Sequence, residues 1–231
     1  MARFWELDAA RGLAVICMVA FNWSFALRYL GVYTFTDGWL YWWLFPRSVA
    51  GAFILIAGIS LALSMARKRP YGHFLKRGLS IFGLGLLVTA GVWLYLGQPL
   101  ITFGILHFIG VAVVLAPAFA PLGKWNLLLG LLLIGLGAYA GVQEVDVPWL
   151  FWLGLKDGGY AALDYFPLLP WFGLFLIGLA VGQIRYAGKK APKSSDKLGM
   201  RQLAGLGQHS LAIYLVHQPL LVGLLLLFGL A

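Results

Sequence analysis

Long apolar segments that carry almost no charge recur from one end of this sequence to the other. Of the 231 residues, 61% are hydrophobic and only 11% are charged. A soluble domain needs more polar surface than this, whereas about 20 consecutive apolar residues form a helix long enough to cross a bilayer. The sequence therefore predicts an all-α, polytopic membrane protein of the cell membrane, with a single domain over residues 1–231.

Seven segments have the length and character of transmembrane helices. They cover residues 9–30, 39–66, 74–96, 99–120, 124–143, 165–184 and 206–229. The first is not followed by a small-residue cleavage site, so we expect a retained helix instead of a signal peptide.

Basic residues gather on one side of these predicted helices. They are Arg3, Arg11, Arg67, Lys68, Arg69, Lys76, Arg77, Lys124, Arg185, Lys189, Lys190, Lys193, Lys197 and Arg201. Acidic residues mark the opposite connections, at Asp37, Glu144, Asp146, Asp157 and Asp164. Because basic loops remain in the cytoplasm, the pattern predicts a cytoplasmic N-terminus and an outer C-terminus. The net charge of +9 follows this topology, and no nucleic-acid module surrounds it, so we expect no nucleic-acid partner.

Three strongly polar side chains interrupt three different apolar segments at a similar depth. Asn22, Arg47 and His107 each lie about eight residues, or about 12 Å, from the predicted outer end. His217 lies about 16 Å from the inner end of the last segment. Since such residues are costly in lipid and usually face a protein interior or a water-filled cavity, we expect them to converge on one polar site.

Six motifs carry a family resemblance. They are residues 3–14 (RFWELDAARGLA), 58–61 (GISL), 74–78 (FLKRG), 103–110 (FGILHFIG), 164–173 (DYFPLLPWFG) and 207–219 (GQHSLAIYLVHQP). Together they resemble the small prokaryotic DUF1624 family, which is related to the catalytic domain of heparan-alpha-glucosaminide N-acetyltransferase. The resemblance implies a transmembrane acyltransferase that moves an acetyl or other acyl group from cytosolic acyl-CoA to an amino or hydroxyl group. The acceptor is expected to be a sugar or lipid on the outer side.

The chain departs from its lysosomal relative in one respect. That enzyme is similar at Asp8, at Arg11 with Gly12 and at Asn22, but it carries an essential histidine in the connection after the matching helix. This chain has no histidine between Leu30 and Trp39. Many small relatives have histidine where this chain has Asn22, so the acetyl-histidine mechanism is not carried over directly.

The candidate catalytic residues are therefore His107, His217, Asn22 and Arg47. A neutral imidazole removes a proton from an attacking acceptor, or takes the acyl group itself. The arginine binds a phosphate or stabilises an oxyanion, and the amide orients a carbonyl. Each also has a structural interpretation, as an interhelical hydrogen bond or an ion pair within the bundle.

Other residues are candidates for ligand contacts. We expect Asp164, Trp171 and Gln218 to bind the acceptor at the outer mouth, although a carboxylate at a helix N-terminus is also a common structural feature. We expect acyl-CoA to contact Asp8, Arg11, Lys76, Arg77 and His209. The alternatives are a local ion pair between Asp8 and Arg11, a helix cap at His209, and basic residues at 76 and 77 that only set the membrane orientation. No zinc-ligand spacing is present, so we expect no metal.

The sequence also predicts local backbone features. Gly137-x-x-x-Gly141 and Gly178-x-x-x-Gly182 predict close helix packing and leave a homodimer open. Pro46 is expected to loosen its helix and free backbone carbonyls.

Two functional alternatives to the enzyme remain: a transporter or flippase of a small amphipathic molecule, and a non-enzymatic membrane scaffold.

Overall fold

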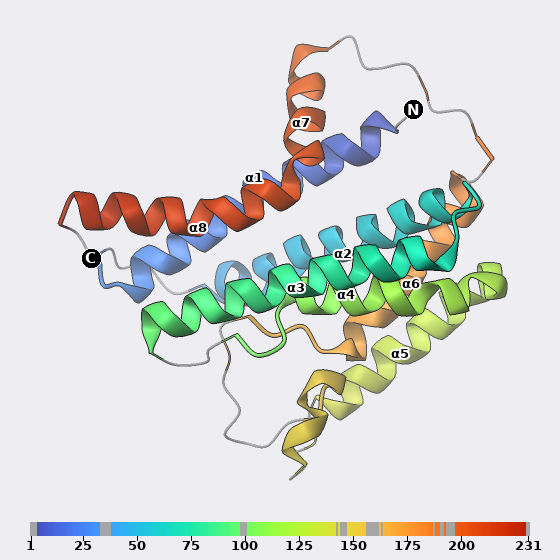
Figure 1. Ribbon diagram of the computed structural model, residues 1–231, viewed down its shortest axis with the longest axis horizontal. Coiled ribbons are helices and arrows are strands. Elements are labelled where there is room, and N and C mark those ends of the chain that lie inside the picture. Colours follow the sequence, from blue (N-terminus) through green and yellow to red (C-terminus); the bar gives the residue numbers. More distant parts are fainter. Residues whose placement is uncertain are drawn as a thin grey trace. The chain divides into compact units, whose positions relative to one another are not determined.

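The protein is described by a computed structural model in which every regular element of the described residues is helical. The structure describes residues 4–32, 38–97, 101–141, 143, 147–155, 162, 164–186, 188–189, 192 and 197–229. The α-helices are α1 (Trp5–Tyr29), α2 (Phe45–Met65), α3 (Tyr71–Leu96), α4 (Ile105–Leu115), α5 (Asn126–Ala140), α6 (Leu168–Arg185), α7 (Leu198–Gln208) and α8 (Ser210–Leu227) (Figure 1). A π-helix, η1 (Leu40–Leu44), precedes α2, and two 3₁₀ helices, η2 (Ala116–Trp125) and η3 (Pro148–Leu153), follow α4 and α5. The charged residues Arg3, Asp37, Glu144, Asp146, Asp157, Lys190 and Lys193 lie outside the described residues.

Six helical segments of the described chain are long and apolar enough to cross a membrane. They are Trp5–Tyr29, Leu40–Met65, Tyr71–Tyr95, Ile105–Ala140, Leu168–Arg185 and Ser210–Leu227. The prediction of an all-helical, multi-pass membrane protein is confirmed at this level. The predicted orientation of the two termini remains a prediction.

The predicted count of seven spans differs from these six in one place. The sequence predicts two helices over residues 99–120 and 124–143, whereas the structure has a segment of 36 residues made of α4, η2 and α5. The chain reverses direction at η2 in Figure 1, where Gly123 has φ 53° and ψ −123°. The 11 residues of α4 continue directly into η2, which is followed by the 15 residues of α5.

The last predicted segment, residues 206–229, begins too early. Residues 206–208 belong to the separate helix α7, and His209 lies at the junction between α7 and α8. The span therefore starts at Ser210, and His209 is exposed at a helix junction instead of lying inside a transmembrane helix.

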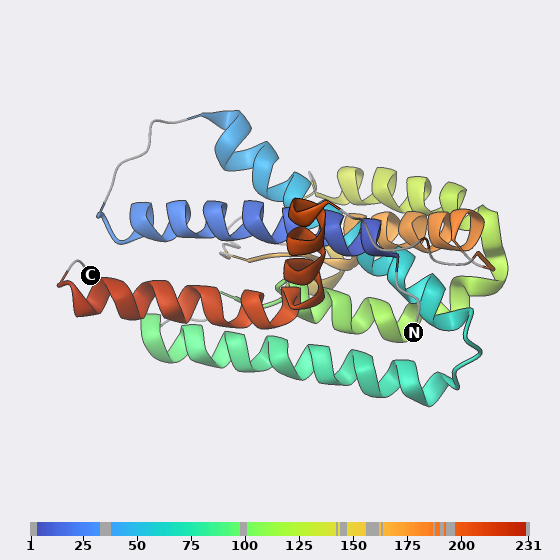
Figure 2. The ribbon, with the colours of Figure 1, turned by 90° about the horizontal axis from the view of Figure 1, so that it is seen from above.

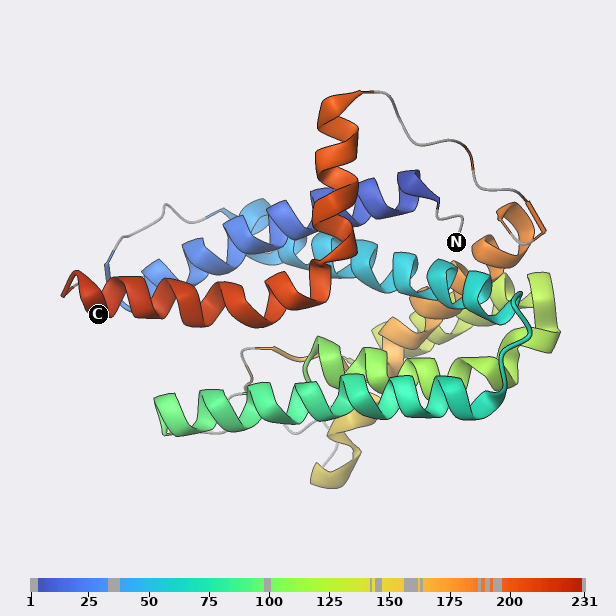
Figure 3. The same cartoon turned by 45° about the horizontal axis from the view of Figure 1, so that its top comes forward.

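The chain forms two compact units, and α2 passes from one to the other. Unit 1 comprises Met1–Phe53 and Lys190–Ala231, and unit 2 comprises Ile54–Lys189. In unit 1, α1 packs against both α7 and α8. The helix α7 lies across the direction of α1 and α8, as Figure 1, Figure 2 and Figure 3 all show.

Tight helix contacts in unit 2 occur at glycines. The helices α3 and α4 meet where a Cβ on Gly110 would lie 2.8 Å from the carbonyl oxygen of Gly78. The helices α5 and α6 meet in the same way, with a Cβ on Gly130 only 2.6 Å from the carbonyl oxygen of Gly173. Such close backbone approach provides the dispersion contacts that hold helices together in lipid.

The two small-residue motifs behave differently. A Cβ at Gly178 would overlap the carbonyl oxygen of Leu55 in α2, and one at Gly182 would lie 2.6 Å from the Cβ of Ala62. Gly137 likewise abuts Pro170 in α6, whereas Gly141 approaches only its own helix. The predicted close packing is therefore confirmed within the chain at three of these four glycines.

Candidate active site

The candidate catalytic residues Asn22 and His217 meet in unit 1. The side-chain nitrogen Nδ2 of Asn22 in α1 lies 3.0 Å from Nε2 of His217 in α8. His217 is buried, with 6% of its surface exposed, and Asn22 is half-buried. Two polar side chains that are costly in an apolar setting thus satisfy each other across a helix contact.

The partners of His217 determine which ring nitrogen carries its proton. Nδ1 lies 2.7 Å from the carbonyl oxygen of Tyr214 and 3.1 Å from that of Ile213. Because a carbonyl oxygen only accepts, Nδ1 must be the donor. In the neutral ring Nε2 then holds a lone pair, which accepts the hydrogen bond from the Asn22 amide. A neutral imidazole with an oriented lone pair is the form that a general base requires.

Two further hydrogen bonds brace the contact between α1 and α8. The indole nitrogen of Trp23 donates to the carbonyl oxygen of His217 at 3.2 Å. The side-chain nitrogen of Gln218 donates to the carbonyl oxygen of Asn22 at 3.3 Å. Gln218, expected from the sequence to bind the acceptor, therefore lies next to the Asn22–His217 pair.

Arg47 interacts mainly with its own helix. Its Nη1 donates to the carbonyl oxygen of Trp43 at 2.9 Å, and its guanidinium lies 4.4 Å from the centre of the Trp43 ring. The π-helix η1 ends immediately before α2, whose second residue is Pro46, and the hydroxyl of Ser48 similarly donates to the carbonyl oxygen of Leu44. The loosening predicted at Pro46 is confirmed, and side chains at two neighbouring positions bind carbonyls of this segment.

His107 lies in unit 2 and caps the N-terminus of α4. Its Nδ1 accepts a hydrogen bond from the backbone nitrogen of Gly104 at 3.2 Å, so Nε2 carries the proton in the neutral ring. The residue is 2% exposed, and Nε2 has no hydrogen-bond partner among the described residues. The ring lies edge-on to Phe82, with 5.1 Å between ring centres, and nearly parallel to that of Phe103, at 5.9 Å.

Asp164 caps the same helix from a distant part of the chain. One of its carboxylate oxygens accepts from the backbone nitrogen of Ile105 at 3.2 Å, where a helix N-terminus favours negative charge. The backbone nitrogen of Phe166 donates to the carbonyl oxygen of Phe103 at 2.8 Å, which ties the two segments together. Trp171, the other acceptor contact expected in this region, packs against the Phe166 ring at 5.0 Å.

The residues expected to contact acyl-CoA fall into two groups. In unit 1, Arg11 forms an ion pair with Asp8 at 2.9 Å, which confirms the local pairing expected for residues three positions apart. Gln208, the neighbour of His209, donates to the other oxygen of Asp8 at 3.4 Å. In unit 2, Lys76 and Arg77 are exposed near the start of α3.

The sequence interpretation missed two amides near η2, one of them buried and the other half-buried. Asn126 is fully buried, and its Nδ2 donates to the carbonyl oxygen of Phe119 at 2.8 Å. Gln183 donates to that of Ala120 at 3.0 Å. Both residues are polar positions in predicted apolar segments, which was the available signal, and both hold the turn that reverses the chain after α4.

Arg47 and His217 belong to unit 1 and His107 belongs to unit 2. The convergence of all three on one cavity therefore remains a prediction. What the structure brings together is Asn22, His217 and Gln218.

The fold and this contact define a polytopic helical membrane protein with a candidate acid–base site. The chain belongs to the family of the heparan-alpha-glucosaminide N-acetyltransferase catalytic domain, whose sequence pattern matches residues 3–219. The resemblance found in the sequence motifs is thereby confirmed, and membership implies a membrane acetyltransferase. No curated protein and no solved structure matches the chain.

Proposed function

We propose that the protein transfers an acetyl or other acyl group from cytosolic acyl-CoA to an amino or hydroxyl group of a sugar or lipid presented on the outer side. Family membership supports the reaction type. The observation that carries the site assignment is the contact of Asn22 Nδ2 with His217 Nε2, which identifies Nε2 as the basic nitrogen.

In this proposal His217 acts as the general base. Nε2 removes the proton from the acceptor's hydroxyl or amino group as that group attacks the thioester carbonyl carbon. The new bond joins the acyl carbon to the acceptor, and the carbon–sulfur bond breaks. The imidazolium then returns the proton to the departing thiolate, so the products are the acylated acceptor and free CoA.

A backbone hydrogen bond stabilises His217 both when it removes the proton and when it returns it. The carbonyl of Tyr214 lies 2.7 Å from Nδ1, and Nδ1 carries a hydrogen in both the neutral ring of this tautomer and the charged ring, so the bond suits both forms. The positive ring that forms during the reaction is therefore hydrogen-bonded from the start, which reduces the cost of charging it in a buried position.

Asn22 has two roles in the proposal. In the resting protein its amide donates to Nε2 and fixes the ring orientation. When the acceptor takes over Nε2, the released N–H of Asn22 is available to the oxygen of the thioester carbonyl, where negative charge develops. An amide suits both roles because it donates without carrying charge.

The remaining candidates are assigned according to their contacts. For acyl-CoA we propose contacts within each unit separately, at Asp8, Arg11 and His209 in unit 1 and at the exposed Lys76 and Arg77 in unit 2, since basic groups attract CoA phosphates. Gln218 is proposed to contact the acceptor, because it adjoins the pair. For His107, Arg47 and Asp164 we propose structural roles, since each is hydrogen-bonded to backbone atoms, His107 and Arg47 nearby in the chain and Asp164 at the start of α4. Trp171 remains a proposed acceptor contact.

The direct test uses purified protein, labelled acetyl-CoA and a panel of amino sugars and hydroxylated lipids. We expect labelled product and free CoA in equal amounts. Transfer of a sugar or lipid across vesicle membranes, with no CoA released, would contradict the proposal and favour the transporter alternative. Absence of product together with absence of thermal stabilisation by acetyl-CoA would contradict it in favour of a scaffold.

A further inference from the structure

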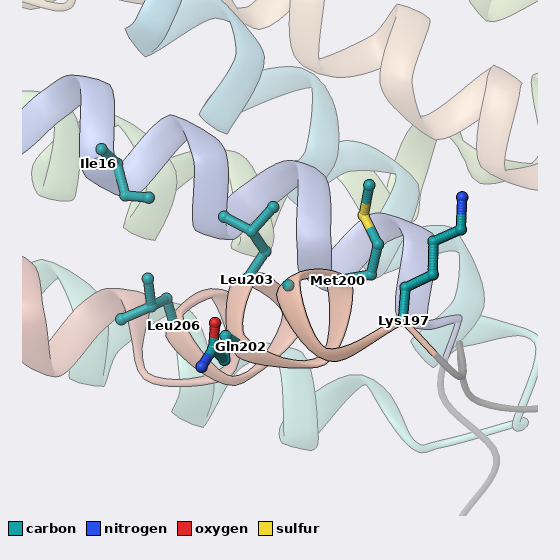
Figure 4. Close-up of a pocket in the computed structure, with 7 residues that line it drawn as sticks. Ile16, Lys197, Met200, Gln202, Leu203 and Leu206 are labelled. Carbon is teal, nitrogen blue, oxygen red and sulfur yellow. The ribbon is translucent and has the colours of Figure 1, made fainter.

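The corner between α1 and α7 is hollow. A cavity of about 560 Å³ lies there, within the size range of ligand sites in proteins. Its lining is drawn in Figure 4 and comprises Ile16, Lys197, Gly199, Met200, Gln202, Leu203 and Leu206. We call this cavity the α1–α7 groove.

The groove has an apolar part and a cationic end. Ile16, Leu203 and Leu206 lie toward one end in Figure 4, and the amine of Lys197 lies at the other, beyond Met200. A ligand that matches this arrangement has a hydrocarbon chain joined to a negatively charged group.

The wall of the groove that α7 provides is held firmly in place. A Cβ at Gly12 of α1 would overlap the carbonyl oxygen of Leu203, and a Cβ at Gly207 would overlap that of Asp8. Backbone contacts this close fix α7 across α1, so the groove beside the crossing is a built feature of unit 1.

The surface of α7 is that of a helix lying in a membrane interface. Its direction crosses those of α1 and α8, which are both candidate spans, so α7 runs along the bilayer plane when they cross the bilayer. Leu198 is 69% exposed and Met200 is 40% exposed. Arg201 is exposed one turn after Lys197, and this combination of apolar and basic residues is typical of interfacial helices.

We propose that the α1–α7 groove binds one anionic phospholipid. An acyl chain lies along Ile16, Leu203 and Leu206, and the phosphate pairs with the ammonium group of Lys197. The charge of the groove's end selects an anionic headgroup over a zwitterionic one, since basic groups near a membrane surface attract anionic lipids. This lipid site is independent of the proposed acyl transfer.

The test measures thermal unfolding of the full-length protein in non-ionic detergent during titration with phosphatidylglycerol or phosphatidylcholine. We expect phosphatidylglycerol to raise the unfolding temperature at lower concentration than phosphatidylcholine. Lys197→Gln should raise the half-saturating phosphatidylglycerol concentration about fivefold. Met200→Asn, which introduces a polar group into the apolar wall at an exposed position, should also raise it.

Lys189→Gln is the matched control, because Lys189 is an exposed lysine in unit 2 and lies outside the groove. It should leave the titration unchanged, and inorganic phosphate should give no stabilisation. Equal responses to the two lipids, or equal losses in Lys189→Gln and Lys197→Gln, would overturn the proposal. So would stabilisation by acyl-CoA through Lys197 in the absence of any response to phosphatidylglycerol.

Discussion

The amide of Asn22 occupies the lone pair of His217 that the proposed reaction needs, at a distance of 3.0 Å. The opposite ring nitrogen is fixed by the carbonyl of Tyr214. The resting state is therefore a closed pair, and an acceptor must displace one hydrogen bond in order to reach the base. This relationship makes the role of Asn22 testable separately from that of His217.

The first prediction compares two substitutions at Asn22. Asn22→Ala removes the donor and should reduce acetyl transfer by about a hundredfold to a thousandfold, as expected for loss of a group that stabilises developing charge. Asn22→Asp should reduce it further, because a carboxylate only accepts and holds His217 in the doubly protonated form. Initial rates with labelled acetyl-CoA provide the measurement. Equal or greater activity in Asn22→Asp than in Asn22→Ala would refute this role.

The second prediction concerns the crossing of α1 and α7. Gly207→Ala should destabilise the protein by about 1–3 kcal/mol, because its Cβ would overlap the carbonyl oxygen of Asp8. Gly205→Ala in the same helix is the control, since its Cβ would meet nothing within 4 Å. It should stabilise the protein by up to about 1 kcal/mol through helix propensity. Unfolding in detergent measures both, and similar effects of the two changes would contradict the packing described here.

The third prediction separates His107 from catalysis. His107→Ala removes a buried hydrogen bond to Gly104 worth about 1 kcal/mol, together with ring contacts to Phe82 and Phe103, so the unfolding temperature should fall. His107→Asn retains a side-chain acceptor and should lose less stability. Transfer per folded molecule should change little in either variant, and a loss of a hundredfold or more with normal stability would show that His107 takes part in the chemistry.

The fourth prediction concerns Arg47 and the π-helix. Arg47→Met removes the hydrogen bond to the Trp43 carbonyl and the contact with its ring, so stability should decrease by about 1–2 kcal/mol. Ser48→Ala removes a neighbouring side-chain bond to Leu44 and should cost less, because no charge is involved. Thermal unfolding of the two variants compares them. Unchanged stability in Arg47→Met, combined with loss of transfer, would favour a direct catalytic role for the arginine.

Local features of the chain were predictable from the sequence because they depend on neighbouring residues. The Asp8–Arg11 ion pair follows from helix periodicity, and the disturbance before Pro46 follows from its missing backbone donor. Apolar length located most of the spans, since a bilayer imposes a fixed thickness. Depth along each helix also singled out Asn22 and His217 as costly residues.

Features that depend on contacts between distant segments were not predictable in the same way. Depth alone does not reveal which faces meet, so the pairing of Asn22 with His217 required the structure. The capping of α4 by Asp164 joins segments separated by about sixty residues, and the hydropathy of the sequence does not predict such a contact. The separate helix α7 was missed because it is only 11 residues long and includes polar residues, so hydropathy alone did not separate its last residues from the apolar segment of α8.

The most direct test of the central claim is the rate of acetyl transfer by His217→Gln. Glutamine keeps an amide within reach of Asn22 but cannot act as a base, so we predict a loss of at least about a hundredfold with the protein still folded. His73→Ala, at a histidine outside the site in α3, should retain the rate of the unsubstituted protein. Retention of that rate by His217→Gln would contradict the assignment of His217 as the base.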